Sequence, residues 1–166
     1  MCLTIYNSKK SRFSNFPEAY SQDTPDALVA DKDIVCYKVL SIDEENGVKK
    51  YNAPYYKYTY EKNVVYNEPM FERTRVIFSQ SISEWERRGW LLVDYGFHSF
   101  VNLKLAESEC AWWRTRTVSA NRNFCIVKCI IPKGSKYYRG FFVETADGDQ
   151  LCYCSESIKI IDIIEC

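Results

Sequence analysis

The only histidine of the chain, His98, is followed by Ser99, and both come just before a predicted helix. An imidazole can move protons near neutral pH or bond a sugar hydroxyl, and the free N–H groups at a helix start attract phosphate. We therefore expect an anion at this helix, with His98 contacting a ribose. An ordinary buried histidine is the competing interpretation, because neither a GxSxG motif nor a Ser-His-Asp triad can be recognised.

Tyrosines are concentrated between residues 51 and 66, where Tyr56, Tyr58 and Tyr60 alternate as on one face of a strand. Tyrosine is common in strands, so packing within a sheet explains the pattern. A wall for a nucleobase explains it equally, since stacking contributes about 1–3 kcal/mol per base. Both interpretations remain open, and Tyr56 and Tyr58 are the predicted ligand contacts.

Two charged residues near predicted strand ends complete the candidates. Lys133 lies in a Lys-Gly-Ser-Lys turn that lacks the spacing of a phosphate-binding P-loop, so it is either an exposed turn residue or an anion contact. Glu156 precedes the last predicted strand. Its carboxylate is of chemical interest if it faces His98 across a cleft.

Composition limits the function classes. The chain has 166 residues, of which 46% are hydrophobic and 27% charged, which suits one globular domain with a real core. Lys plus Arg and Asp plus Glu each number 22, and this balance disfavours binding to nucleic acid or to a membrane surface. No apolar run approaches the roughly 20 residues of a membrane span.

The eight cysteines lie mostly in apolar strand-like runs, without CxxC spacing and with one histidine in the whole chain. We expect buried free thiols, no metal site and a reducing, cytoplasmic location. Residues 1–20 also lack the apolar core of a signal peptide.

The elements that position these residues are predicted from periodicity. Residues 1–28 are expected to form an irregular arm, and 29–166 a single α+β domain with a mixed or antiparallel sheet and about two helices. The clearest helix begins near Asn102, and a short second helix begins at Ser83. Strands are expected at 34–40, at 48–51 after the Asn46-Gly47 turn, and at 90–95, 124–131, 136–144, 151–154 and 158–164.

In this order the elements resemble the ADP-ribosyltransferase fold. Tyr37-Lys38 stands on its first strand, His98-Ser99 before its helix, Ile131-Pro132-Lys133-Gly134 in its turn, and Ser155-Glu156 before its late strand. The resemblance implies a nucleotide site with contacts from Tyr37, Lys38, His98 and Ser99. It also implies NAD as cofactor if the chain is an enzyme, with Glu156 and His98 as catalytic residues.

The segments around Gly96-Phe97-His98-Ser99 and Ile131 to Tyr138 also resemble small proteins carried by phages of gut bacteria. This resemblance implies a phage setting, hence the host cytosol, and no particular activity.

Three functions follow. The preferred one is a nucleotide-binding protein that sequesters a signal of host immunity, because a Ser-Thr-Ser motif is absent and Cys154 stands where a second acidic residue is expected. The first alternative is an active NAD-dependent ADP-ribosyltransferase. The second is an inhibitor that binds a host enzyme through the N-terminal arm and exposed aromatic side chains such as Trp112.

Overall fold

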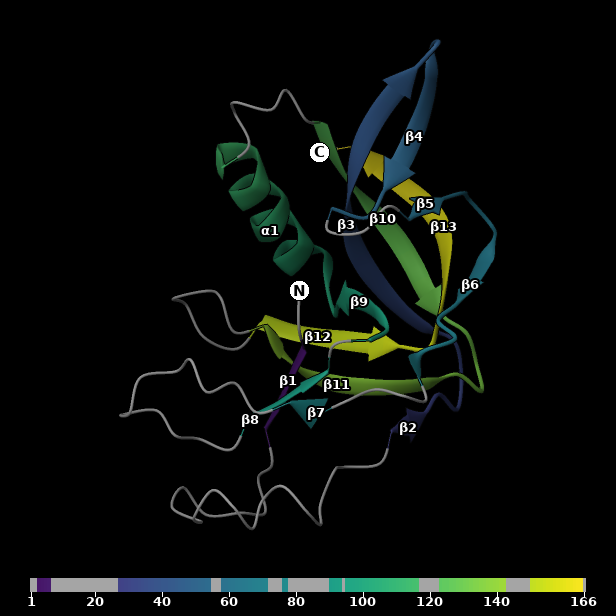
Figure 1. Cartoon of the computed structure of the whole chain (residues 1–166), viewed down its shortest axis with the longest axis vertical. Helices are drawn as coiled ribbons and strands as arrows, with labels where there is room; N and C mark the ends of the chain where they lie inside the picture. The colour runs from purple at the N-terminus through teal and green to yellow at the C-terminus, as the bar shows by residue number, and fades with distance from the viewer. Residues whose placement is uncertain are drawn as a thin grey trace.

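The computed structural model describes residues 3–6, 27–54, 58–71, 76–77, 90–93, 95–116, 123–142 and 150–165. In this part of the chain, thirteen strands form one sheet and a single helix packs beside it (Figure 1). Every strand pairing is antiparallel. The α+β class is therefore right, with an antiparallel rather than a mixed sheet. The predicted second helix at Ser83 lies outside the described residues.

The helix is α1 (Leu103–Arg116). The strands are β1 (Leu3–Tyr6), β2 (Leu28–Val29), β3 (Ile34–Glu45), β4 (Val48–Asn52), β5 (Thr59–Tyr60), β6 (Val65–Asn67), β7 (Val76–Ile77), β8 (Trp90–Val93), β9 (Phe97–Phe100), β10 (Asn123–Ile131), β11 (Lys136–Phe142), β12 (Gln150–Ser155) and β13 (Ser157–Glu165).

The sheet consists of two halves that meet between β3 and β9. The strand order is β6-β13-β10-β3-β9-β12-β11-β1-β8-β7, with β2 beside β11, and β4 and β5 added beside β3. Strands β3 and β9 pair only where Tyr37 faces Phe100. In Figure 1, β3, β10 and β13 run steeply while β11 and β12 lie across them. The sheet therefore changes direction at the joint between β3 and β9, where only one residue pair connects the two strands.

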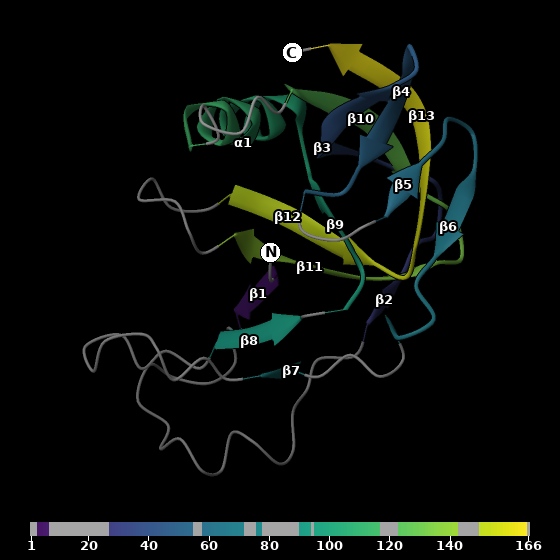
Figure 2. The same ribbon diagram turned by 45° about the horizontal axis from the view of Figure 1, so that its top comes forward.

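The core lies on both faces of the β3–β10 pair. On one face, Cys36 and Leu40 of β3 pack with alternate residues of β10 such as Val127. On the other face, Val39 and Ile126 pack beneath α1 (Figure 2). Residues buried on both faces explain why these two strands read as nearly continuous apolar runs. The predicted strands at 34–40 and 124–131 are confirmed.

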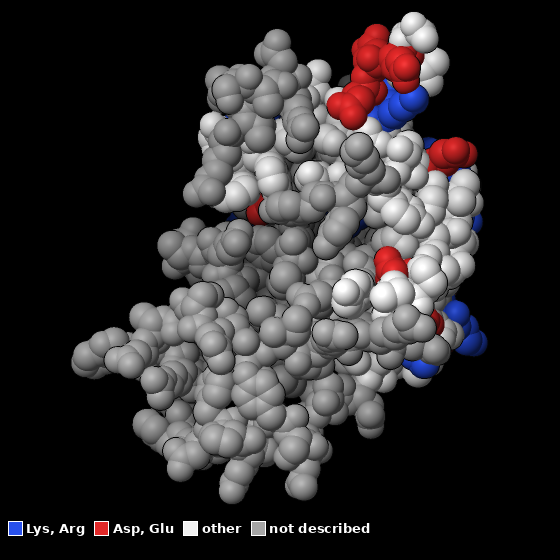
Figure 3. Space-filling view, in the orientation of Figure 1, with Lys and Arg blue, Asp and Glu red and all other residues white. Residues whose placement is uncertain are grey.

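The β3–β4 hairpin turns at Asn46 and Gly47, whose φ angles are 54° and 77°. Two successive left-handed residues are what a two-residue hairpin turn needs. Its tip is charged, because Asp43 and Glu44 face lysines of β4 and Lys50 is ion-paired with Glu45. Figure 3 shows these charges gathered at one end of the molecule.

Helix α1 confirms the predicted packing face. Ala106 and Cys110 are buried, and Leu103 and Trp113 pack against the same core cluster. Trp112 differs from the prediction, because it is half-buried and packs edge-on against Trp113 at a centroid distance of 5.2 Å. That contact removes part of the surface that an exposed anchor would offer.

The helix begins as predicted at Asn102, whose side-chain Oδ1 accepts a hydrogen bond of 3.0 Å from the backbone N–H of Leu105. Replacing Asn102 by Ala leaves that N–H without its cap and should lower the free energy of unfolding by about 1 kcal/mol. Urea denaturation measures this loss. Lys104→Ala, an exposed change in the first turn of the same helix, should cost less than about 0.5 kcal/mol. Equal costs would show that the cap does not stabilise the helix.

The predicted N-terminal arm is wrong at residues 3–6. These residues form β1, which lies between β11 and β8. The run Leu-Thr-Ile-Tyr suits a strand, but four residues ahead of a polar stretch give too short a pattern for a prediction. Residues 7–26 lie outside the described part of the chain.

Candidate functional site

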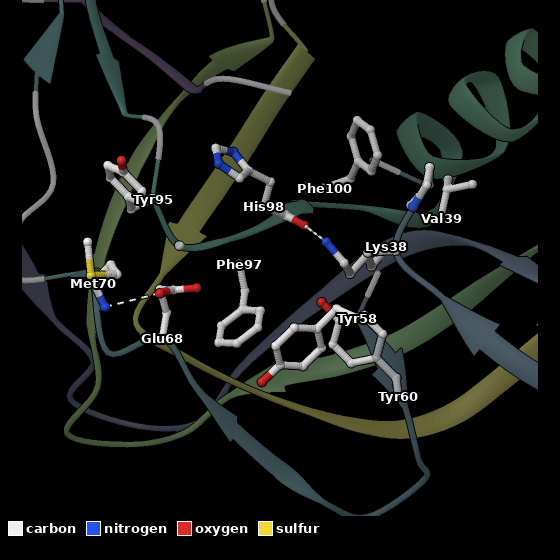
Figure 4. A pocket seen from close by; sticks show the side chains of 13 residues that line it. Lys38, Val39, Tyr58, Tyr60, Glu68, Met70, Tyr95, Phe97, His98 and Phe100 are labelled. Carbon is white, nitrogen blue, oxygen red and sulfur yellow. Dashed lines mark hydrogen bonds between the residues drawn. The ribbon is translucent and has the colours of Figure 1, made fainter. Parts of the chain in front are cut away.

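A cavity of about 280 Å³ lies where β3 and β9 separate. Its walls come from β3 and β9 and from the segments around β4, β5 and β6, so it sits at the joint between the two halves of the sheet. Most of the described lining is apolar, and Lys38, Glu68 and His98 add polar groups to those of the tyrosine hydroxyls (Figure 4). An apolar cavity with a few polar groups is the usual form of a small-molecule site.

Aromatic rings form one wall of this cavity. Tyr58 and Tyr60 lie 5.2 Å apart between ring centroids, and Tyr58 meets the ring of Phe97 edge-on at 5.8 Å. Tyr66 packs behind both tyrosines at 5.5 and 5.1 Å. Desolvation raises the pKa of Tyr58 and of the more deeply buried Tyr60. Both phenols are therefore protonated at neutral pH and can donate a hydrogen bond.

Tyr58 and Tyr60 lie together as predicted, but they do not share one strand. Tyr58 precedes β5, which has only two residues, so these side chains do not alternate along one long strand. Tyr60 is 3% exposed and serves the core, whereas Tyr58 is half-buried at the cavity. Both residues line the cavity and pack with the same core cluster, and Tyr58 is the more exposed of the two. Tyr56 lies outside the described residues.

Lys38 reaches into the cavity from the middle of β3. Its Nζ donates a 2.8 Å hydrogen bond to the backbone oxygen of His98 and lies 5.9 Å from the centroid of the Tyr60 ring. This side-chain bond links β3 to β9 where the backbone pairing has stopped (Figure 4). Desolvation lowers the pKa of Lys38, although nearby thiol groups oppose part of the effect.

Glu68 supplies a carboxylate that the sequence analysis missed. Its Oε1 accepts a 3.0 Å bond from the backbone N–H of Met70, which also lines the cavity. In the view of Figure 4, Glu68 and Lys38 lie on either side of the Phe97 ring. Among the described residues, the second carboxylate oxygen has no hydrogen bond. Glu68 stands in a short Asn-Glu-Pro-Met stretch without periodicity, so no pattern could have indicated it.

His98 is predicted only to precede the helix, outside the strand expected at 90–95. It lies inside β9, all four residues of which are buried. Its ring is on the opposite side of β9 from Phe97 (Figure 4), and its Nε2 is 3.7 Å from Sγ of Cys154 on the adjacent strand. The imidazole is therefore close to a thiol, while the backbone oxygen of His98 contacts Lys38.

The remaining predicted residues within the described ranges do not line the cavity. Tyr37 packs on the α1 side of β3. Ser99 is buried, and its Oγ has no hydrogen-bond partner of normal geometry among the described residues. It lies near Cys36, where burial raises the thiol pKa but the neighbouring Cys129, Ser99 and Lys38 outweigh that effect and lower it.

Lys133 and Glu156 have structural contacts elsewhere. Lys133 is exposed in its turn, and its backbone N–H donates to Oδ1 of Asp33 at 2.8 Å. The Oε1 of Glu156 accepts a 2.7 Å bond from the backbone N–H of Lys136 and so fixes the bend between β12 and β13. Of the predicted site residues, the cavity therefore brings together Lys38, Tyr58 and His98. Their roles as ligand contacts remain predictions.

The cysteines of the described part are free thiols and all are buried: Cys36, Cys110, Cys125, Cys129, Cys152 and Cys154. Burial, with the Glu109 carboxylate nearby, raises the pKa of Cys152 to about 12. Across the described ranges, no three side chains of His, Cys, Asp or Glu are grouped as metal ligands would be. The helix found there, α1, does not meet the length and hydropathy of a membrane-crossing helix.

Comparison with protein-family models, with curated protein sequences and with solved structures finds no match for this chain.

Proposed function

We propose that the chain binds a small nucleotide through its base in the cavity between β3 and β9, on an ADP-ribosyltransferase-like scaffold and without chemical turnover. The observation that carries this proposal is the cavity itself, an aromatic-lined space of about 280 Å³ with a carboxylate and an amine in its lining. That volume is near the lower end for small-molecule sites. It suits one heterocyclic ring system better than a whole dinucleotide.

The lining offers complementary contacts to a base. A flat heterocycle can pack against Tyr58 and Phe97, since aromatic side chains stack on any base. An amino group on the base can donate to Glu68, and a ring nitrogen or carbonyl can accept from Lys38. Among the described residues, Lys38 is the one lysine or arginine that lines the cavity, and in this arrangement the phosphates of the ligand lie outside it.

The scaffold part of the proposal rests on the resemblance together with two observations. An antiparallel sheet with one flanking helix opens between two strands, and Lys38 and His98 stand on the two sides of that opening. Glu156, which the resemblance makes catalytic, bonds Lys136 instead and lies away from the cavity lining. That separation favours binding over transfer from NAD. In the phage setting, binding without turnover acts by sequestering a nucleotide signal of host immunity in the host cytosol.

Calorimetric titration with AMP, GMP, CMP, UMP and NAD tests the proposal. At least one nucleotide should bind, and Tyr58→Leu should weaken its affinity about tenfold or more because a stacking surface is lost. Tyr51→Leu is the matched control, since Tyr51 packs against the same core cluster without lining the cavity. It should bind as the unaltered protein does. Equal losses in both variants, or no binding by the unaltered protein, would contradict the proposal.

A further inference from the structure

Lys38 is exceptional among the described lysines in its surroundings. Its amine lies in an apolar cavity, and its contacts are the backbone oxygen of His98 and the ring of Tyr60. No carboxylate pairs with it among the described residues. Lys50 and Lys62, in contrast, are exposed and ion-paired with Glu45 and Asp162.

An ammonium without a counter-charge is costly in such a place, whereas a neutral amine is not. Desolvation accordingly lowers the pKa of Lys38. Lysines that act as nucleophiles are usually activated in this way, by a water-poor pocket that favours the uncharged form. The cavity supplies both this environment and the space for a carbonyl compound beside Nζ.

We propose that Lys38 is a nucleophilic amine that forms an imine with aromatic aldehydes entering the cavity between β3 and β9. The aromatic wall of Tyr58 and Phe97 selects a flat carbonyl compound. The hydrogen bond to the His98 oxygen holds Nζ at the inner side of the cavity while leaving the nitrogen lone pair free to react. This reaction goes beyond nucleotide binding and does not depend on it.

Imine formation needs no oxidant and no reactant besides the aldehyde. The lone pair of neutral Nζ forms a bond to the carbonyl carbon, and the π electrons of the C=O bond move to oxygen, which gains a proton as nitrogen loses one. The resulting carbinolamine loses its hydroxyl with the second amine proton as one water molecule. A C=N bond to Lys38 remains.

The test is reductive trapping on the full chain. The protein is incubated at pH 7.5 with 4-hydroxybenzaldehyde and cyanoborohydride, which transfers hydride to the imine carbon and leaves a stable secondary amine. Peptide mass spectrometry then gives the rate at each lysine. Lys38 should react at least about tenfold faster than Lys50 or Lys62, because a larger fraction of its amine is neutral.

Two controls keep the result specific. Lys38→Arg removes the reactive amine and should abolish the fast modification while the slow reaction of surface lysines continues. If that variant fails to fold, the site-by-site rates in the unaltered protein decide the question alone. Modification of Lys38 no faster than of Lys62 would overturn the proposal. Nucleotide binding measured on the same sample would be unaffected by that failure, so the two proposals are tested separately.

Discussion

Replacing Gly96 by Ala should lower the free energy of unfolding by about 3 kcal/mol or more, the largest effect that we expect from a single methyl group in this chain. Gly96 has a φ of 131°, a backbone conformation that L-residues rarely adopt. A Cβ atom there would lie 2.4 Å from Sγ of Cys154, and 3.1 Å from both Cδ2 of Phe71 and the backbone oxygen of Ser155. Backbone strain and steric overlap therefore both contribute to the cost of Gly96→Ala.

Gly134→Ala separates these two causes. Gly134 also has a positive φ, 86°, but a Cβ there would meet no atom within 4 Å. It should cost only the backbone strain, about 1 kcal/mol. Denaturant unfolding of both glycine variants, of Cys154→Ala, and of Gly96→Ala combined with Cys154→Ala gives the overlap contribution as a coupling free energy. If Gly96→Ala cost no more than Gly134→Ala, the close packing of Gly96 against β12 would be refuted.

Lys38→Met should make the folded protein more stable at pH 7, by about 1–3 kcal/mol. The change gives up the bond to the His98 oxygen, which contributes about 1 kcal/mol. It also removes an amine that must either be buried as a charge or lose its proton on folding, and replaces it with an apolar chain of similar length. A gain in stability at a cavity-lining residue is expected where function, rather than folding, has favoured the lysine.

The pH dependence of stability tests independently whether Lys38 destabilises the folded protein. Burial lowers the pKa of Lys38, so between its folded and unfolded pKa values the unfolded chain binds more protons. The unfavourable contribution of Lys38 to stability is fully present below the pKa of Lys38 in the folded protein. It disappears as the pH rises to the ordinary lysine range. The advantage of Lys38→Met should therefore shrink as the pH rises.

The raised pKa values of Tyr58 and Tyr60 affect the unaltered protein and Lys38→Met alike, so they cancel in the stability difference between the two. Lys133→Met, a change at an exposed turn, should alter stability by less than about 0.5 kcal/mol. Thermal and urea unfolding from pH 7 to 10 measure all three proteins. A Lys38→Met protein less stable than the unaltered one at pH 7 would show that the amine is satisfied in the folded state.

Much of the fold follows from local patterns. The apolar runs of β3 and β10, the Asn46-Gly47 turn and the Asn102 cap each depend on residues adjacent in sequence, and each is found where it is expected. The pattern predicts one strand at 90–95 before the helix and gives no separate strand at β9. The structure instead has β8 and β9 as separate strands, with Gly96 just before the second.

The site could be predicted only in part. Tyr58 and His98 are predicted from residue type and position, and Lys38 from the resemblance, and the cavity lining includes all three. Its position was not predictable, because it depends on β3 and β9 separating after one residue pair, a long-range feature of the sheet. Glu68 and Met70 enter the lining through a segment without regular periodicity. Glu156 is predicted to be of chemical interest as a carboxylate before a strand, yet it accepts a hydrogen bond from the backbone N–H of Lys136 in β11.

Methyl NMR on the full chain tests the central proposal most directly, that a nucleotide base occupies the cavity between β3 and β9. The chain has two methionines, Met1 and Met70, of which Met70 lines the cavity. With ¹³C-methyl methionine and increasing nucleotide, the Met70 signal should shift saturably through the ring current of the bound base. An unmoved Met70 signal with a nucleotide that calorimetry shows to bind would place the site elsewhere and contradict this account.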